Sequence, residues 1–142
     1  MSALGGDNEP ASVPPLIRPP SVPTLNRGRL DAIERDVSRE FLIELVELFV
    51  TDVAVRLERL SDAVKARQTK RASSLAHALQ GSAASLGVLK LRSVAQRLEE
   101  LMESDDWGAS DATLARLIHE FKHVCQVLKA IGSEPPPERV AK

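Results

Sequence analysis

The placement of proline constrains this chain more than any other feature of its sequence. Six of the nine prolines lie between Pro10 and Pro23, and the other three are Pro135, Pro136 and Pro137. Proline disrupts a helix interior because it lacks the amide donor and its ring clashes with the preceding turn. Residues 27–132 therefore form one proline-free stretch, long enough for a single domain. Residues 1–26 and 133–142 are predicted to be disordered tails or linkers.

Apolar residues in the proline-free stretch recur at intervals of three and four, which is typical of amphipathic helices. A short helical segment is expected around Leu30, Ile33 and Val37. Four long helices are predicted after it, at residues 38–66, 69–86, 89–103 and 110–131. Short connections favour antiparallel neighbours, so the predicted fold is all-α: an antiparallel up-and-down four-helix bundle with a short additional N-terminal helix.

Residues suited to helix ends flank these segments. Ser38 or Asp36 can cap the first long helix, and Gly87 can end the second in a left-handed conformation. Ser110, followed by an acidic residue, predicts the start of the last helix after a linker at residues 104–109.

Composition gives no support for several classes of function, although a local charged patch could still attract nucleic acid or an anionic membrane. A formal net charge of −1 provides no global attraction to nucleic acid or to an anionic membrane, and aromatic residues for base stacking are few. No apolar run is long enough for a membrane span, and no signal peptide is recognisable at the N-terminus. The single Cys125 cannot form an internal disulfide, which suits a reducing compartment. The chain is therefore expected to be cytoplasmic.

One histidine falls on the polar side of the second long helix. At about 100° per residue, Leu75, Leu79 and Leu86 cluster within about 40°, while His77 lies about 180° from their mean. Exposed histidines are usually inert, but Gly81 and the small Ala84 follow on the same exposed strip. A glycine in a helix interior costs about 1 kcal/mol relative to alanine. Gly81 either permits close packing of a neighbouring helix or, as we prefer, leaves room for a partner to approach His77.

The segment around this histidine resembles a known family. It reads His-Ala-Leu-Gln-Gly-Ser-Ala-Ala-Ser-Leu-Gly over residues 77–87, which is similar to the signature of histidine phosphotransfer (HPt) domains. The apolar helix at residues 41–49 and the Leu98-Glu99 pair also resemble the family, so that the resemblance extends over roughly residues 27–130.

The resemblance implies a monomeric bundle that carries a phosphoryl group on His77. Gly81 would give the partner access, and Ser82 would help to fix the helix turn. The implied partners are receiver domains of a hybrid histidine kinase or a response regulator, which hold the Mg²⁺ that the reaction needs. The chain itself would bind no ATP, metal or other cofactor. The alternative is an HPt-like helical adaptor that docks receiver domains without transferring phosphate.

The chain departs from the family pattern at Gln80, where the family usually has lysine. An amide can donate a hydrogen bond to a phosphoryl oxygen but cannot neutralise its charge. A compensating basic rim around His77 is predicted from the cations that dominate residues 63–98, although these could equally be ordinary solvated helix faces. The predicted rim consists of Lys70, Arg71, Lys90, Arg92 and Arg97.

The sequence His119-Glu120-Phe121-Lys122-His123 matches the H-E-x-x-H pattern of zinc proteases. Both histidines are predicted to face bulk water, without the enclosing pocket that a catalytic zinc requires. We interpret them as a surface pair that can take up added zinc or nickel, and we predict no resident metal.

Overall fold

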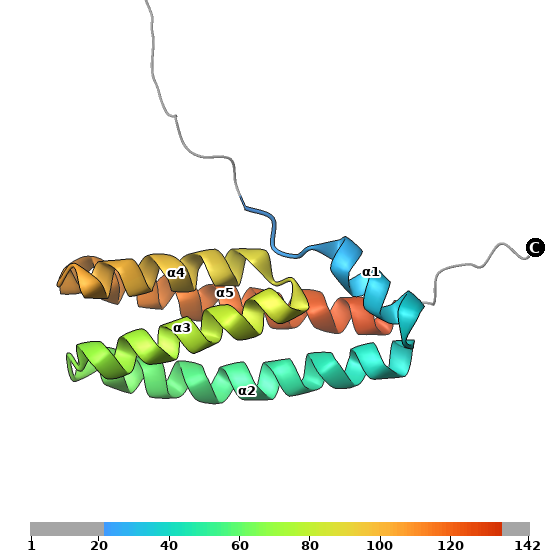
Figure 1. Ribbon diagram of the computed structural model, residues 1–142, viewed down its shortest axis with the longest axis horizontal. Coiled ribbons are helices and arrows are strands. Elements are labelled where there is room, and N and C mark those ends of the chain that lie inside the picture. The colour runs from blue at the N-terminus through green and yellow to red at the C-terminus, as the bar shows by residue number, and fades with distance from the viewer. Residues whose placement is uncertain (1–21, 135–142) are drawn as a thin grey trace, which may run out of the picture.

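The computed structural model describes residues 22–134, which form five helices joined by short turns (Figure 1). The helices are α1 (Arg27–Asp36), α2 (Arg39–Lys65), α3 (Thr69–Leu86), α4 (Leu89–Glu103) and α5 (Trp107–Ser133). The predicted all-α bundle with an additional N-terminal helix is confirmed. The predicted bounds of α3 and α4 are also confirmed.

The four long helices α2 to α5 form an antiparallel bundle in which each helix packs against the next. Helix α2 also packs against α5, so α3 and α5 lie diagonally opposite each other. The short helix α1 lies beside α2 at one end of the bundle (Figure 1). The core between the helices is built from aliphatic side chains, with Leu60, Leu79, Leu98 and Leu117 fully buried.

Local sequence accounts for most helix ends. The Ser38 hydroxyl accepts a hydrogen bond from the Phe41 amide at 3.0 Å and caps α2, as predicted. The Asn26 side chain caps α1 by accepting from the Arg29 amide at 3.1 Å. Gly87 ends α3 with φ +78°, the left-handed conformation that glycine adopts at low cost.

The predicted start of the last helix at Ser110 is wrong, because α5 begins at Trp107. Asp105 adopts φ +63°, which turns the chain early, and the Asp106 carboxylate then accepts from the Ala109 amide at 3.1 Å. The cap is therefore Asp106. Ser110 is buried in the first turn instead, and its hydroxyl donates to the Asp106 carbonyl at 2.7 Å.

Arg67, in the α2–α3 turn, contacts the beginning of α5 at this end of the bundle. Its guanidinium donates to both carboxylate oxygens of Asp111, at 2.8 and 3.0 Å, and lies 5.0 Å from the centre of the Trp107 ring. The hydrogen bond from Arg67 lowers the pKa of the Asp111 carboxyl. This contact links the turn to the first residues of α5.

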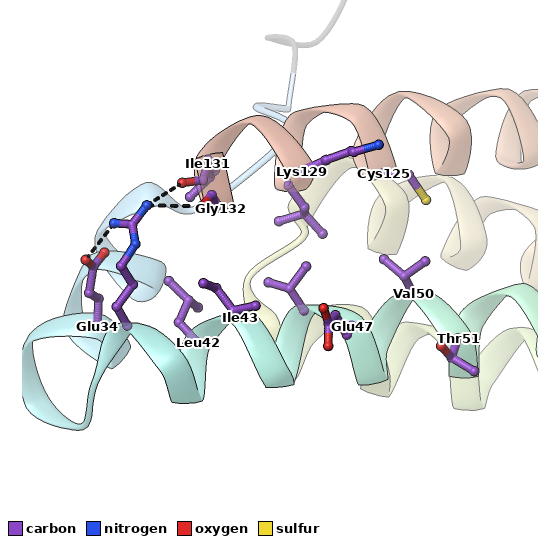
Figure 2. Close-up of a pocket in the computed structure, with 13 residues that line it drawn as sticks. Glu34, Leu42, Ile43, Glu47, Val50, Thr51, Cys125, Lys129, Ile131 and Gly132 are labelled. Atoms are coloured by element: carbon purple, nitrogen blue, oxygen red, sulfur yellow. Dashed lines mark hydrogen bonds and ion pairs between the residues drawn. The ribbon is translucent and has the colours of Figure 1, made fainter. Parts of the chain in front are cut away.

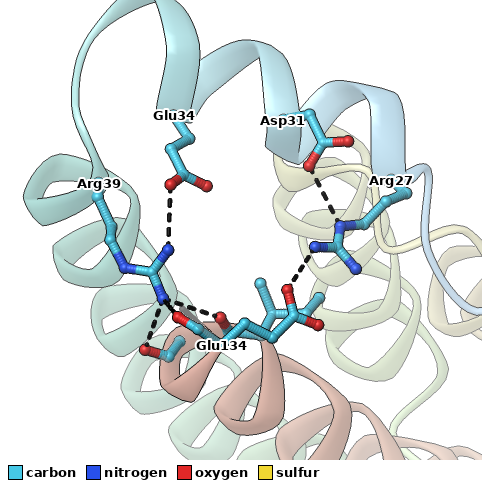
Figure 3. A network of polar contacts seen from close by, with 7 residues as sticks. Arg27, Asp31, Glu34, Arg39 and Glu134 are labelled. Carbon is cyan, nitrogen blue, oxygen red and sulfur yellow. Dashed lines mark hydrogen bonds and ion pairs between the residues drawn. The ribbon is translucent and has the colours of Figure 1, made fainter. Parts of the chain in front are cut away.

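A polar clasp joins α1, α2 and the end of α5 at the opposite end of the bundle (Figure 3). Arg27 bonds to Asp31 at 3.2 Å within α1 and to Glu134 at 2.7 Å. Arg39 bonds to Glu34 at 3.1 Å and also donates to carbonyl oxygens at the end of α5, namely those of Ile131, Gly132 and Glu134.

Residues 22–26, part of the predicted N-terminal tail, make specific contacts with the bundle. The Thr24 carbonyl accepts from the Leu89 amide at 3.0 Å, and the Asn26 amide donates to the Gly87 carbonyl at 2.7 Å. These bonds hold the segment before α1 against the α3–α4 turn. The remaining parts of the predicted tails, residues 1–21 and 135–142, lie outside the described residues.

An apolar groove of about 470 Å³ runs between α2 and the second half of α5 (Figure 2). Leu42, Ile43 and Val50 line its α2 side, and Cys125 lines its α5 side. Partial burial raises the pKa of the Cys125 thiol. None of the helices in the described part of the chain is long and apolar enough to cross a membrane.

Candidate functional site

His77 lies in the middle of α3 with its imidazole exposed. The side chain is 76% exposed, whereas Leu79 and Leu86 of the same helix are buried and Leu75 is partly buried. The structure thus places His77 on the face of α3 that the helical periodicity predicted. Because α3 is packed along its other face against α2 and α4, the ring is held at a fixed place on the surface of the bundle.

The surface next to His77 carries almost no side-chain bulk. Gly81, one turn further along α3, is exposed, and a Cβ added there would meet nothing within 4 Å. Ala84 follows it and is also exposed. The alternative role for Gly81, close packing of a neighbouring helix, is therefore ruled out. The surface at Gly81 and Ala84 therefore leaves one side of the imidazole open to a partner.

Glu99 of α4 stands on the other side of the ring. Its Oε1 atom lies 3.6 Å from His77 Nδ1, and its side chain is only 20% exposed. This separation is slightly too long for a hydrogen bond but is within ion-pair distance. A carboxylate there favours a proton on Nδ1, which leaves the lone pair of Nε2 available as a nucleophile.

Gln80 holds the Glu99 carboxylate in place. Its side-chain amide donates to Glu99 Oε1 at 2.6 Å and to the Ala76 carbonyl of its own helix at 3.3 Å. The Gln80 amide, which could have donated to a phosphoryl oxygen, therefore donates to a carboxylate instead. The residue that departs from the family pattern thus acts on the histidine through Glu99.

Ser82 connects α3 to α2 on the side away from Glu99. Its hydroxyl donates to Asp52 at 3.3 Å, and Asp52 in turn pairs with Arg56 at 2.9 Å. This chain of contacts is consistent with the role in fixing the helix that the family resemblance implied.

The five cations of the predicted basic rim are not brought together around His77. Lys70 lines the same surface hollow as His77, and Arg71 bonds to Gln68 at 3.2 Å. On α4, Arg92 lies within about 20° of the Glu99 direction, given about 100° per residue. Lys90 and Arg97 lie about 160° to 180° away from that direction, on the far side of α4.

The hollow beside His77 contains acids as well as a base. Glu99 and Glu103 line it together with Lys70, Ser73 and Ser74. Only Lys70 and Arg92 of the predicted cations remain on the side of the bundle that carries His77. The immediate surroundings of the imidazole are thus more acidic than the charge pattern of the sequence indicated.

Comparison with protein-family models decides the family. The model described as Hpt domain matches residues 44–131, more than half of the chain. The chain belongs to the Hpt domain family. Its role is phosphotransfer in a phosphorelay; Hpt proteins are phosphocarriers rather than kinases, and they interact with receiver domains.

Two solved Hpt structures resemble the bundle. The histidine-containing phosphotransfer protein B (HptB) from Pseudomonas aeruginosa PAO1 is 23% identical, with a TM-score of 0.72, covering 79% of this chain and 96% of its own. The histidine-containing phosphotransfer protein ZmHP2 from maize is 20% identical, with a TM-score of 0.69, covering 76% and 82%. At these identities the likeness establishes the fold. No curated protein matches the sequence significantly.

Glu99 is the functional candidate that sequence reasoning did not assign. The sequence contained a signal for it, since Leu98-Glu99 was part of the resemblance to HPt domains. The contact itself depends on the antiparallel register of α3 and α4, which places residues 77 and 99 side by side. The charge pattern of the sequence could not show this contact, because it does not reveal which residues of α3 and α4 face each other.

The H-E-x-x-H residues lie on α5, away from the site. His119 and His123 are both exposed, as predicted, whereas Glu120 is only 6% exposed. Its Oε2 atom is buried and has no hydrogen-bond partner among the described residues. The two histidines and the glutamate therefore do not share a water-filled pocket of the kind that a zinc protease requires.

Proposed function

We propose that His77 is the residue that accepts the phosphoryl group from a receiver-domain aspartate and passes it to another receiver, or the reverse. The observation that carries this proposal is the arrangement of α3, where an exposed imidazole has an open glycine surface on one side and the Glu99 carboxylate on the other.

The reaction is a direct displacement at phosphorus. The Nε2 lone pair of His77 forms a bond to the phosphorus atom while the bond between phosphorus and the aspartate oxygen breaks, which returns the aspartate to its carboxylate form. The proton stays on Nδ1, so the phosphorylated ring carries positive charge. Glu99, 3.6 Å from Nδ1, stabilises that charge. In the reverse direction the same ring is the leaving group.

An apolar surface on α2 beside this site supports docking of a receiver domain. Leu48 is 66% exposed and Phe41 is 40% exposed, although both are large apolar side chains. They line a hollow that extends to Ser82 and Ser85 of α3, next to Gly81. Exposed apolar side chains grouped in this way are typical of protein interaction sites. A receiver covering this surface would place its acidic cleft over His77.

The metal ion for the reaction comes from the partner receiver domain. We propose that Mg²⁺ is held by the receiver's acidic site and that this chain provides the nucleophile and its positioning, without an ATP site of its own. The partner receivers belong to a hybrid histidine kinase or a response regulator. We also propose that the chain is a cytoplasmic monomer, with Lys70 and Arg92 contributing to receiver docking.

The test is phosphoryl transfer from a phosphorylated receiver domain with Mg²⁺ present. The unmodified chain should gain an acid-labile phosphoryl group that peptide mass spectrometry maps to His77. His77→Gln should abolish acceptance while leaving the melting temperature nearly unchanged, because an exposed side chain contributes little to stability. Phosphate mapped to His119 or His123, or retained in His77→Gln, would contradict the proposal. Receiver binding without transfer would favour the adaptor alternative.

A further inference from the structure

The phosphotransfer site does not use the two other histidines of the chain. His119 and His123 lie four residues apart in the interior of α5, a helix that runs without interruption from Trp107 to Ser133. Residues four apart in an α-helix project from the same face, with Cβ atoms about 5 to 6 Å apart. Both side chains are exposed, and no hydrogen bond or ion pair within residues 22–134 fixes either ring.

This pair lies on the opposite side of the bundle from His77. Helix α5 packs against α2 and α4, and it lies diagonally opposite α3. The exposed strip of α5 therefore points away from the phosphotransfer surface. Whatever binds there leaves the approach to His77 open.

We propose that His119 and His123 together chelate one divalent late transition-metal ion. Imidazole nitrogen is a preferred ligand of Zn²⁺, Ni²⁺ and Cu²⁺, with metal–nitrogen bonds of about 2.0 to 2.1 Å for zinc. Two imidazoles one helical turn apart can reach a single ion of this kind when their side chains rotate toward each other. Water fills the remaining coordination positions.

The surroundings determine what kind of metal site this is. Within the described part of the chain, no group of three or more His, Cys, Asp or Glu residues is placed to hold a metal ion. Glu120, the acid of the motif, is buried and lines a hollow with His119, Lys90 and Arg116, whereas His123 does not line it. The site is consequently an open two-ligand chelate on the surface, which excludes the metalloprotease chemistry that the motif suggests.

Zinc titration of the full chain tests this inference. Isothermal calorimetry should show saturable binding of one Zn²⁺ per chain, and added Zn²⁺ should raise the melting temperature because the two histidines are held one turn apart only when α5 is folded. Mg²⁺, which prefers oxygen ligands, should have neither effect at the same concentration. His119→Ala and His123→Ala should each weaken Zn²⁺ binding at least tenfold, because a single imidazole cannot chelate.

A variant with the same number of histidines controls for the spacing. In His123→Ala combined with Gln126→His, the two histidines of α5 are seven residues apart, about 10 Å along the axis, too far for a shared ion. This variant should bind as weakly as His123→Ala alone, whereas His77→Gln should bind zinc normally. Full affinity in the spaced variant, loss of binding in His77→Gln, or no saturable binding by the unmodified chain would overturn the proposal.

Discussion

Glu99 gives His77 an environment that few exposed histidines have. The imidazole is open to solvent on one side, yet its Nδ1 atom faces a carboxylate that is 20% exposed and fixed by Gln80. An exposed histidine with no such neighbour can rotate freely and exchange its tautomers. Here the carboxylate beside Nδ1 favours one ring orientation, with Nε2 as the nucleophilic nitrogen.

The contribution of Glu99 can be measured by removing its charge alone. Glu99→Gln should slow phosphoryl transfer about two- to five-fold, equivalent to roughly 0.5 to 1 kcal/mol, because the positive ring of the phosphorylated state loses its partner. Rates of transfer from a phosphorylated receiver provide the measurement. Glu103→Gln removes the same charge one turn away in the same hollow and should have a much smaller effect. Equal effects would indicate general electrostatics rather than the contact.

Cys125 allows a second prediction at the level of a single side chain. Burial raises the pKa of its thiol, so the reactive thiolate forms only at higher pH than in an unfolded peptide. Alkylation by iodoacetamide at pH 7.5 should therefore be slower in the folded chain than in the chain unfolded by urea, with the difference shrinking as pH rises. Equal rates at pH 7.5 would show that the groove does not shield the thiol.

Helix α3 was the most predictable element. Its bounds, its glycine end and the exposed position of His77 all follow from the 3.6-residue period and the low cost of a left-handed glycine. The beginning of α5 was not predictable in this way. Ser110 is a good capping residue by type, but Asp106 precedes it and the left-handed Asp105 turns the chain first. Local preference pointed to Ser110 alone, whereas the cap is Asp106, and the residue that follows it, Trp107, packs against Arg67.

The open surface of α3 can be filled without damage to the helix. Because a Cβ at Gly81 meets nothing within 4 Å, Gly81→Leu should fold and be at least as stable as the unmodified chain. It should nevertheless slow phosphoryl transfer tenfold or more, since its side chain would occupy the space beside His77. Gly132→Leu is a matched control, because Gly132 is equally open but lies at the far end of α5. Normal transfer by Gly81→Leu would mean that the clearing is incidental.

At the scale of the whole molecule, the sequence predicted the bundle but not which charges would meet. The basic rim failed to assemble because Lys90 and Arg97 lie on the far side of α4, a fact that depends on how α4 is rotated against α3. The clasp at the end of the bundle could not be predicted either, since Arg27 and Glu134 are 107 residues apart in sequence. Periodicity identifies which face of each helix is buried, but it does not determine the register between helices.

The clasp makes a prediction for global stability. Arg39→Ala should lower the free energy of unfolding by about 1 to 2 kcal/mol, because it leaves Glu34 and the last carbonyls of α5 without their donor. Urea denaturation followed by circular dichroism measures the change. Arg35→Ala is the control, since the Arg35–Asp36 pair is 70% and 66% exposed and should contribute less than about 0.5 kcal/mol. If both variants lose the same stability, the clasp is no stronger than a surface ion pair.

The bond between Arg27 and Glu134 has a mechanical consequence. It brings the first turn of α1 and the residue that follows α5 together at one end of the bundle. Tension applied between residue 22 and Glu134 would load this bond together with the Thr24–Leu89 and Asn26–Gly87 backbone bonds at the α3–α4 turn. His77 lies nine residues before Leu86, the end of α3 next to that turn, or about 14 Å along the helix axis, and is therefore set back from the loaded contacts.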